Sequence, residues 1–484
     1  MSRVLHAIAH HARTRPAALA LLGSGMAVTY GELARGIDAA ADHLRRSDVR
    51  VLALALDNGP AWALWDLAAQ RATVAVVPIP PFFTPEQTTH ALTDAGVEAL
   101  VCAGDDSSLP IAGCQWRTFH RSARPLPAGT AKVTYTSGTT RAPKGVCLAQ
   151  DAVDVVVASV AEAAVAGTAD RHLALLPLAV LLENIGGLYV PLYVGGTAML
   201  EPLARVGMAG SSTLDAQRML AALGACEATT AIAVPGILDS LVRALEQEAG
   251  APDHLRYLAV GGAVVSPRLL TRARALGLPA YQGYGLSECA SVVAVNGPGD
   301  DDPASVGRPL RHTRLAFADD GEILVRSEGF LGYLGEAPRT DPWWATGDLG
   351  RLDAERRLHI HGRKKNVFIT AFGRNVSPEW IEAELSADGA VQQAVVFGEA
   401  RPWNVAVIVS SGCDTAVDAA VARANTRLPD YAQVRRWLRA AQPFTPDNGL
   451  ATANGRPRRD AVWNRYADAL TGLYDHQQTP EATA

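Results

Sequence analysis

The sequence lacks the features that define several large classes of protein. Its six cysteines form no CxxC pair and show no zinc-ligand spacing, so neither a disulfide framework nor a structural zinc site is indicated, and reduced thiols in the cytoplasm are expected. Lysine and arginine do not cluster with aromatic residues, and the formal net charge is −5. That distribution of charge argues against a nucleic-acid partner.

Long uninterrupted apolar runs are also missing. Histidine and arginine interrupt the first fifteen residues, so no signal peptide is expected there. Residues 173–200 are almost entirely apolar, but two prolines and four glycines break them into short pieces. We therefore expect buried strand–turn–helix structure rather than a membrane span, with a membrane-associated protein as the weaker alternative.

Two familiar nucleotide-binding motifs, the Walker A loop and GxGxxG, are absent. Lysine is scarce as well: the 44 basic residues include only Lys132, Lys144, Lys364 and Lys365. A lysine kept in a loop rich in glycine and hydroxyl groups is therefore expected to serve a chemical purpose, whereas Lys132 could be incidental.

The length and the alternation of helical and strand patterns predict an α/β fold. A chain of 484 residues should form about two to four domains or subdomains. Helical stretches alternate with short apolar runs in the first 130 residues, which is typical of layered parallel sheet, and a β-rich section and a compact α/β tail follow. The expected helices are 4–13, 31–45 and 378–385, and the expected strands are 27–30, 51–56, 73–79, 321–326, 358–361, 390–397 and 405–410.

The most informative stretch is residues 133–146, which follow an apolar strand. Hydroxyl groups and backbone N–H groups in such a loop bind anionic oxygens, and a lysine adds a point charge. A polar surface turn is the alternative, and the scarcity of lysine argues against it. The residues that would hold phosphate are Thr136, Ser137, Gly138, Thr139, Thr140 and Lys144.

Residues 135–146 resemble the phosphate loop of the acyl-adenylate-forming superfamily, which includes acyl-CoA synthetases, adenylation domains of peptide synthetases and luciferases. Arg141 stands where that family usually has glycine. Further motifs match in the family's order along nearly the whole chain, from about residue 29 to residue 459. The implied fold is a large N-terminal domain of several α/β subdomains (1–363) and a small, mobile α+β C-terminal domain (364–484).

The run Tyr284-Gly285-Leu286-Ser287-Glu288 resembles the family's aromatic-Gly-x-Thr-Glu motif. The resemblance implies that the ring of Tyr284 stacks on adenine, that the hydroxyl of Ser287 meets the α-phosphate and that Glu288 holds Mg²⁺. A flat π-face suits a base, and a carboxylate suits a hard cation.

Small residues are expected around the acid and the base. Gly261-Gly262-Ala263 resembles the turn that lines the adenine and acyl pockets, and Gly261 and Gly285 would border the acyl group. Residues 176–184 resemble a segment of long-chain acyl-CoA synthetases in which Val180 replaces a histidine or other aromatic residue close to the acid. An aliphatic wall suits an apolar acyl chain, although core packing explains it equally well.

The last matches lie in the C-terminal third. Thr346-Gly347-Asp348 resembles the TGD motif, so Asp348 and Arg363 would contact the ribose, and Lys365 would be the hinge of the small domain. Near the end of the chain, Arg456 stands where the family has a lysine that bridges the acid and the α-phosphate. Arginine keeps the charge but is longer and planar, so it is not an equal substitute.

The resemblance implies an ATP- and Mg²⁺-dependent ligase that converts a carboxylic acid to acyl-AMP, releases pyrophosphate and passes the acyl group to a thiol. Coenzyme A is the expected acceptor, and an acyl-CoA synthetase of fatty-acid metabolism the leading interpretation. One alternative is a ligase that loads the phosphopantetheine arm of an acyl carrier protein. Another is a nucleotide-binding protein whose ligation is impaired because Arg456 replaces lysine.

Overall fold

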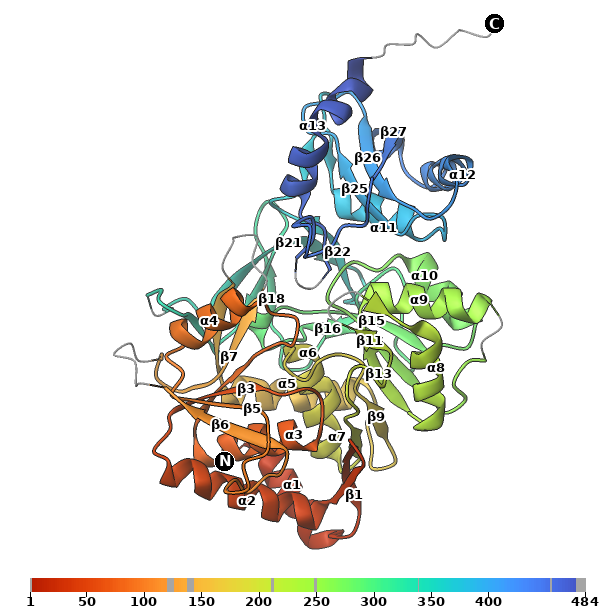
Figure 1. The fold of residues 1–484 in the computed structure, drawn as a ribbon. Coiled ribbons are helices and arrows are strands. Elements are labelled where there is room, and N and C mark those ends of the chain that lie inside the picture. The colour runs from red at the N-terminus through yellow and green to blue at the C-terminus, as the bar shows by residue number, and fades with distance from the viewer. Residues whose placement is uncertain are drawn as a thin grey trace, which may run out of the picture. The chain divides into compact units, whose positions relative to one another are not determined.

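The computed structural model describes residues 2–119, 126–136, 143–209, 213–247, 250–337, 339–452 and 455–475. The chain divides into two compact units (Figure 1). The large unit comprises 1–319, 323–346 and 351–359, and the small unit comprises 320–322, 347–350 and 360–484. This division follows from compactness and does not locate a hinge. The predicted domain boundary after residue 363 therefore stays a prediction.

A seven-stranded sheet forms one layer of the large unit. Its order is β20 (Phe330–Tyr333), β8 (Lys144–Ala149), β7 (Thr130–Thr136), β4 (Ala75–Pro78), β3 (Val51–Ala55), β5 (Ala99–Ala103) and β6 (Cys114–Thr118). The central strands β3, β4, β5 and β7 run parallel, as predicted.

Helices cover both faces of this sheet. Leu52 and Leu54 belong to the core that includes α2 (Tyr30–Arg46) and α3 (Pro60–Ala72), whereas Val51 and Ala53 pack in a second core with α4 (Pro85–Asp94). Burial on both sides explains why β3 reads as a continuous apolar run instead of an alternating one. Helix α2 begins at Tyr30 because the side chains of Thr29 and Glu32 cap its first turn reciprocally.

A nine-stranded sheet forms the other main layer of the large unit. Its order is β17 (Arg308–Pro309), β16 (Ala294–Val295), β15 (Ala280–Tyr284), β14 (Tyr257–Val260), β13 (Thr230–Ala233), β9 (Arg171–Leu173), β10 (Thr197–Met199), β1 (Leu19–Gly23) and β2 (Met26–Thr29). Its central strands are parallel and share one core with α8 (Ala216–Ala225), α9 (Pro235–Glu246) and α10 (Pro267–Ala275), which are green in Figure 1. The remaining helices of the unit include α1 (Arg3–Thr14) and α5 (Gln150–Ala163).

The apolar segment 173–200 is internal to the large unit. It continues from β9 into a short helix α6 (Leu181–Glu183), a π-helix (Asn184–Tyr189), α7 (Val190–Val194) and β10, which agrees with the expected buried strand–turn–helix structure. Gly187 leaves room for a buried carboxylate, because a Cβ there would lie 2.0 Å from Oε1 of Glu183. Among the described residues, no helix is both long and apolar enough to cross a membrane.

Lys132 is not incidental, because its ammonium group anchors a buried polar network. Nζ lies 2.8 Å from Oδ1 of Asp66, 2.5 Å from Oδ1 of Asn184 and 2.9 Å from the hydroxyl of Tyr189. The Tyr189 hydroxyl in turn donates to Asp66. The network ties the π-helix to β7 and α3.

A four-stranded sheet has the order β18 (Leu315–Phe317), β19 (Glu322–Arg326), β21 (Trp343–Leu352) and β22 (Leu358–Arg363). Two two-stranded sheets pair β11 (Met208–Ala209) with β12 (Thr213–Leu214) and β23 (Phe368–Ile369) with β24 (Asn375–Val376). The expected strands at 321–326 and 358–361 are therefore present as β19 and β22.

The tail of the small unit is built on a three-stranded sheet of β25 (Gln393–Phe397), β26 (Asn404–Val409) and β27 (Val434–Arg439). Ala394 and Val396 pack in one core with α11 (Pro378–Ser386) and α12 (Asp414–Asn425), while Val395 and Phe397 pack in another with α13 (Arg459–Asp475). The period-2 alternation of the strand thus sends neighbouring side chains to opposite helices.

Candidate active site

A tight turn presents Glu288. The residue lies in a single 3₁₀ turn (Ser287–Cys289) that follows β15, and the backbone N–H groups of Cys289 and Ser291 both donate to the carbonyl of Leu286. Ala290 and Ser291 have φ values of 52° and 93°, in the left-handed region. Such conformations cost about 1–3 kcal/mol each and are concentrated at functional sites.

The backbone of the turn leaves no room for a side chain at Gly285. A Cβ on Gly285 would lie 1.5 Å from the carbonyl oxygen of Ser291, within the strained turn. The role of Gly285 beside the acid stays a prediction.

Two hydrogen bonds hold Glu288 in place. The hydroxyl of Tyr333 donates to Oε1 of Glu288 at 2.6 Å, and the hydroxyl of Ser327 donates to the backbone carbonyl of Glu288 at 2.5 Å. Burial and the neighbouring Glu288 carboxylate raise the pKa of Tyr333, so the phenol keeps the proton that it donates.

Lys144 lies near the ring of the same tyrosine. Its Nζ is 4.8 Å from the centroid of the Tyr333 ring and 3.0 Å from Oε1 of Glu336. The antiparallel pairing of β20 with β8 places Tyr333 opposite Val146. Lys144, two residues earlier, faces the same side of the sheet as Val146 and is therefore a diagonal neighbour of Tyr333.

The described residues include both ends of the predicted phosphate loop. Thr136 ends β7, and its register partner is Lys144, the first residue of β8. The intervening predicted residues, Ser137, Gly138, Thr139 and Thr140, and with them Arg141, lie outside the described residues.

The predicted adenine and acyl residues collect at one edge of the nine-stranded sheet. Strands β14 and β15 are parallel neighbours, so the Gly261-Gly262-Ala263 turn and the Tyr284 motif both follow the carboxyl ends of adjacent strands. Ligands of open α/β sheets bind at that edge. Tyr284 and Ser287 are half-buried there, and Gly262 has a positive φ of 85°.

The segment expected to line the acid reaches the same place. A Cβ built on Gly261 would lie 3.7 Å from the Gly283 carbonyl oxygen and 3.8 Å from Cδ2 of Leu182, which is ordinary contact distance. Val180, half-buried, immediately precedes α6 and lies two residues before Leu182. The geometry thus brings Leu182 to the glycine turn, and the role of Val180 stays a prediction.

The small unit brings the two predicted ribose residues together. Nε of Arg363 lies 2.7 Å from Oδ1 of Asp348, whose side chain is only 4% exposed. Strand β21 is held next to Asp348 because the Gly347 N–H donates to Glu322 at 2.9 Å and the carbonyl of Gly347 accepts from the N–H of Lys364.

Arg456 lies in the electrostatic environment of the same pair. Its backbone N–H donates to the hydroxyl of Thr452 at 3.2 Å, and its carbonyl accepts from the N–H of Thr452 at 2.8 Å. Desolvation of the guanidinium group and the charge of Arg363 lower its pKa, and the carboxylates of Glu379 and Asp348 oppose them. The pKa of Lys365 is lowered by burial, by Arg363 and by Arg456.

Three cationic groups, Arg363, Lys365 and Arg456, are therefore close enough to perturb one another. The carboxylates of Asp348, Glu379 and Asp460 act on the same groups with the opposite sign.

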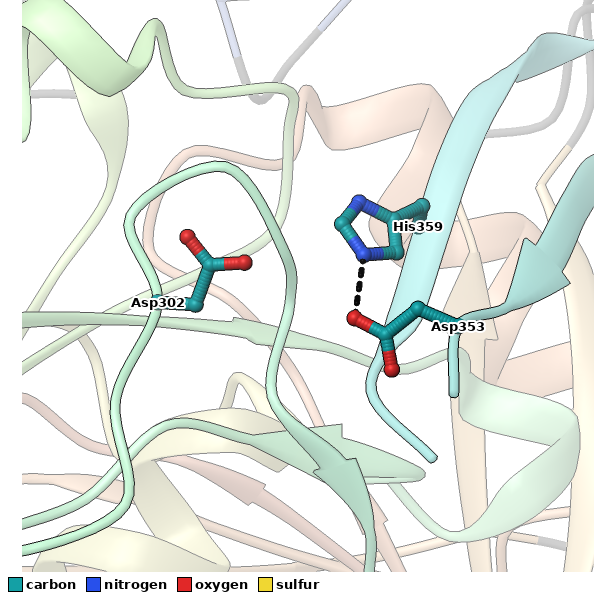
Figure 2. A group of neighbouring side chains, drawn as sticks. All are labelled: Asp302, Asp353 and His359. Carbon is teal, nitrogen blue, oxygen red and sulfur yellow. Dashed lines mark hydrogen bonds and ion pairs between the residues drawn. The ribbon is translucent and has the colours of Figure 1, made fainter. Parts of the chain in front are cut away.

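One further cluster was not expected from the sequence. Ligand-type atoms of Asp302, Asp353 and His359 all lie within 4.8 Å of one another (Figure 2). His359 contacts Asp353 at 2.9 Å through Nε2 and the carbonyl of Ala304 at 3.1 Å through Nδ1, and the N–H of Arg357 donates to Asp353. The contacts of Asp353 with Arg357 and His359 close the turn between β21 and β22, and the Ala304 carbonyl holds His359 against the segment that carries Asp302.

The sequence analysis missed the residues that hold Glu288 and Lys144, namely Ser327, Tyr333 and Glu336. The pairing of β20 with β8 brings Tyr333 to Lys144, almost 190 residues away, whereas Ser327 and Tyr333 reach Glu288 from 39 and 45 residues away, and no local spacing predicts these contacts. The only signal in the sequence was an aromatic residue in a short glycine-rich strand, and such a pattern is common.

Comparison with known proteins assigns both parts of the chain. A family model described as "AMP-binding enzyme" matches residues 8–334, and one described as "AMP-binding enzyme C-terminal domain" matches residues 365–478. The long-chain-fatty-acid–CoA ligase FadD15 of Mycobacterium bovis is 29% identical over 72% of this chain and 70% of its own length. Feruloyl-CoA synthase of an Amycolatopsis species is 27% identical over 87% of this chain and 91% of its own.

A solved structure agrees with this assignment. The o-succinylbenzoate coenzyme A synthetase MenE of Bacillus subtilis, in complex with ATP and magnesium ion, superposes with a TM-score of 0.75. The alignment covers 95% of this chain and 99% of that one at 23% identity, which establishes similarity of fold.

Proposed function

Because this chain belongs to the AMP-binding enzyme family, we propose that it activates a largely apolar carboxylic acid with ATP and transfers the acyl group to coenzyme A. It is an enzyme of the AMP-forming acid–CoA ligase family. Its fold is the α/β adenylate-forming fold, with a large N-terminal domain and a small C-terminal domain over residues 365–478. The acid, the acceptor and the residue roles are the proposed parts.

The observation that carries the proposal is the arrangement of Lys144, Tyr333 and Glu288. It combines a cation at the end of the phosphate loop with a carboxylate that has one oxygen hydrogen-bonded by a phenol. A carboxylate is the kind of ligand that Mg²⁺ prefers, so the residues present fit that ion. When bound, Mg²⁺ neutralises negative charge on the phosphates.

The chain's own residues would act by positioning and by neutralising charge. An oxygen of the acid attacks the α-phosphorus of ATP, the bond to the pyrophosphate oxygen breaks, and the acyl group becomes an acyl-AMP anhydride. Lys144 and Thr136 would hold the leaving phosphates, while Tyr284 and Asp348 would hold the nucleoside. Precise positioning of two reactants is a major source of catalysis in such a step.

Arg456 would take the place of the bridging lysine. Its surroundings support this role, because Asp348 and Arg363 act on its charge within the small unit. Arginine is a planar donor with a fixed fork geometry, so we expect it to bind a phosphate or carboxylate oxygen from a different angle than lysine. Adenylation at an altered rate is therefore expected.

In the second step a thiol attacks the acyl carbon and AMP leaves. Rotation of the small domain about Lys365 would admit the thiol, which is how two-step enzymes commonly separate their reactions. Coenzyme A is the proposed acceptor because both curated relatives described above are named as CoA ligases or synthases. A carrier protein with a phosphopantetheine arm is the alternative acceptor.

The proposed acid is apolar because aliphatic residues dominate the segment that reaches Gly261. Leu182 lies at the glycine turn, and Val180 stands where related long-chain enzymes have an aromatic residue. The names of the similar proteins refer to a long-chain fatty acid, a feruloyl group and o-succinylbenzoate. Membership of the family therefore does not by itself identify the acid.

The test is pyrophosphate release with ATP and Mg²⁺ across a panel of fatty, aryl and amino acids, with hydroxylamine to trap acyl-AMP. Lys144→Ala should abolish release, and Arg456→Lys should change its rate. Arg45→Ala removes an exposed cation of α2 that pairs with Asp42, and should leave release unchanged.

Release that depends on a subset of acids would identify the acid class, and addition of coenzyme A or a carrier protein would then identify the acceptor. No release by the wild-type protein with any acid, but release by Arg456→Lys, would refute the proposed activity and favour a nucleotide-binding protein with impaired ligation.

A further inference from the structure

Tyr333 contacts both the Glu288 carboxylate and the Lys144 ammonium group, which form the proposed phosphate site of the large unit. Its hydroxyl donates to Glu288 at 2.6 Å, and its ring centroid lies 4.8 Å from the ammonium nitrogen of Lys144. We propose that Tyr333 is a positioning residue that sets the geometry of the metal-binding carboxylate relative to the phosphate-loop lysine. This inference rests on the proposed function, because it assumes that Glu288 holds a metal ion bound to ATP.

The hydroxyl determines which oxygen of Glu288 faces the metal. Oε1 accepts from Tyr333, so Oε2 would be the oxygen left to hold a cation. Ser327 holds the backbone of the same residue through its carbonyl. A ligand that is already oriented by such outer contacts loses less freedom when the metal binds.

The ring of Tyr333 is itself held firmly. Its centroid lies 5.2 Å from that of Phe330 and 5.8 Å from that of Trp344, both in edge-on geometry. The guanidinium group of Arg339 lies over the rings of Phe330 and Trp344 and donates to the carbonyls of Ser327 and Phe330. Arg339 therefore links the support of the ring to the residue that holds the backbone of Glu288.

Lys144, by contrast, is held loosely. Its ion pair with Glu336 is about half exposed on both sides, at 51% and 52%. An exposed pair of this kind is weak and competes poorly with a phosphate group. The aromatic face can keep the ammonium group near Glu288 while the lysine exchanges Glu336 for phosphate.

A tyrosine that only packs would behave differently from one that positions Glu288. Loss of a packing residue would lower stability and affect binding of ATP with and without metal equally. Loss of the positioning hydroxyl would weaken specifically the metal-dependent part of nucleotide binding, because only the metal uses Glu288. The two roles can therefore be separated by titration of the metal.

The experiment compares wild type, Tyr333→Phe and Tyr30→Phe. Tyr30 supplies a matched control, since its buried hydroxyl donates to the Gly196 carbonyl at 2.8 Å on another face of the large unit. ATP binding is measured by calorimetry without metal and with Mn²⁺ or Mg²⁺, and pyrophosphate release is measured against free Mg²⁺. Ser327→Ala is included as a second variant that loosens Glu288 without altering the ring.

In Tyr333→Phe the Mg²⁺ concentration for half-maximal binding should rise roughly tenfold or more, since a hydrogen bond to a charged group is lost. Metal-free ATP binding should change less than about twofold, because Lys144 keeps its contact with the ring face. Ser327→Ala should shift the metal requirement in the same direction by a smaller factor. Tyr30→Phe should leave it unchanged.

An unchanged metal requirement in Tyr333→Phe, or an equal loss of ATP binding with and without metal, would overturn the inference. If wild type binds the metal–ATP complex but releases no pyrophosphate with any acid, the proposed function fails while the binding data still decide the role of Tyr333. If wild type binds ATP no better with metal than without it, the inference about Tyr333 is overturned directly.

Discussion

The buried pair of Lys132 and Asp66 makes a quantitative prediction about stability. The side chains are 4% and 0% exposed, and Nζ lies 2.8 Å from the carboxylate. Removing one partner of such a pair leaves a buried charge and costs about 3–5 kcal/mol. Lys132→Met and Asp66→Asn, which change shape little, should each destabilise the protein by that amount.

The double variant should be far less destabilised than the sum of the single variants. With both substitutions no unpaired charge remains buried, so the expected loss is well below the sum of about 6–10 kcal/mol. The remaining cost comes from Tyr189 and Asn184, which lose hydrogen bonds to the pair.

Urea unfolding followed by circular dichroism and tryptophan fluorescence is the assay, with free energies taken where the two transitions coincide. Trp62 is a suitable local reporter because its ring centroid lies 5.8 Å from Nζ of Lys132. Asp42→Asn, which breaks an exposed pair with Arg45 on α2, is the control and should cost at most about 1 kcal/mol. A single substitution that costs no more than the control, or a double variant equal to the sum, would refute this reasoning.

The pH dependence of Asp66→Asn provides a second check on the same pair. Burial already lowers the pKa of Lys132, and Asp66 counteracts that effect. Without Asp66 the amine should lose its proton in the folded state at a lower pH than in the unfolded chain. The variant should therefore gain stability as the pH rises toward the ordinary lysine pKa of about 10.4.

Two further predictions concern Glu336 and His312. Glu336→Gln should tighten ATP binding by at most about fivefold at low salt, because the exposed pair with Lys144 is worth up to about 1 kcal/mol. The gain should fade at high salt. Weaker ATP binding of the variant in calorimetry would contradict a competing role for Glu336. Burial lowers the pKa of His312 from 6.5 to about 4, so between those values the unfolded chain holds a proton that the folded protein lacks. Wild type should thus lose up to about 1.4 kcal/mol per pH unit on acidification, and His312→Gln should show a smaller fall in melting temperature between pH 7 and pH 5. Parallel pH curves would contradict this assignment.

Local patterns were sufficient to predict much of the architecture. The expected helices and strands correspond to elements such as α2, β3, α11 and β26, because helical and strand periodicities depend on neighbouring residues. The glycines and prolines of residues 173–200 correctly indicated buried short elements. The motifs predicted that Asp348 and Arg363 both contact the ribose; the structure pairs the two side chains, and the ribose contact stays a prediction.

The structural roles of Gly285 and Lys132 could not be predicted from the sequence. The sequence does not reveal that a side chain at Gly285 would collide with the carbonyl of Ser291, while the role of Gly285 beside the acid stays a prediction. The partner of Lys132 cannot be predicted from its neighbours in the chain, because that partner, Asp66, lies 66 residues earlier. The sequence alone shows the residue types and their spacing. Only the folded structure shows which of the charged residues are buried.

The sequence by itself therefore determined the family-type motifs, the α/β alternation and the candidate nucleotide residues, since each depends on residues close together in the chain. Only the tertiary structure decided which distant groups meet. Pairing of β20 with β8 places Tyr333 between Lys144 and Glu288, and the register of two strands cannot be deduced from either strand alone. The motifs of the phosphate site are thus visible in the sequence, whereas the contacts of Tyr333 that hold the site depend on strand pairing.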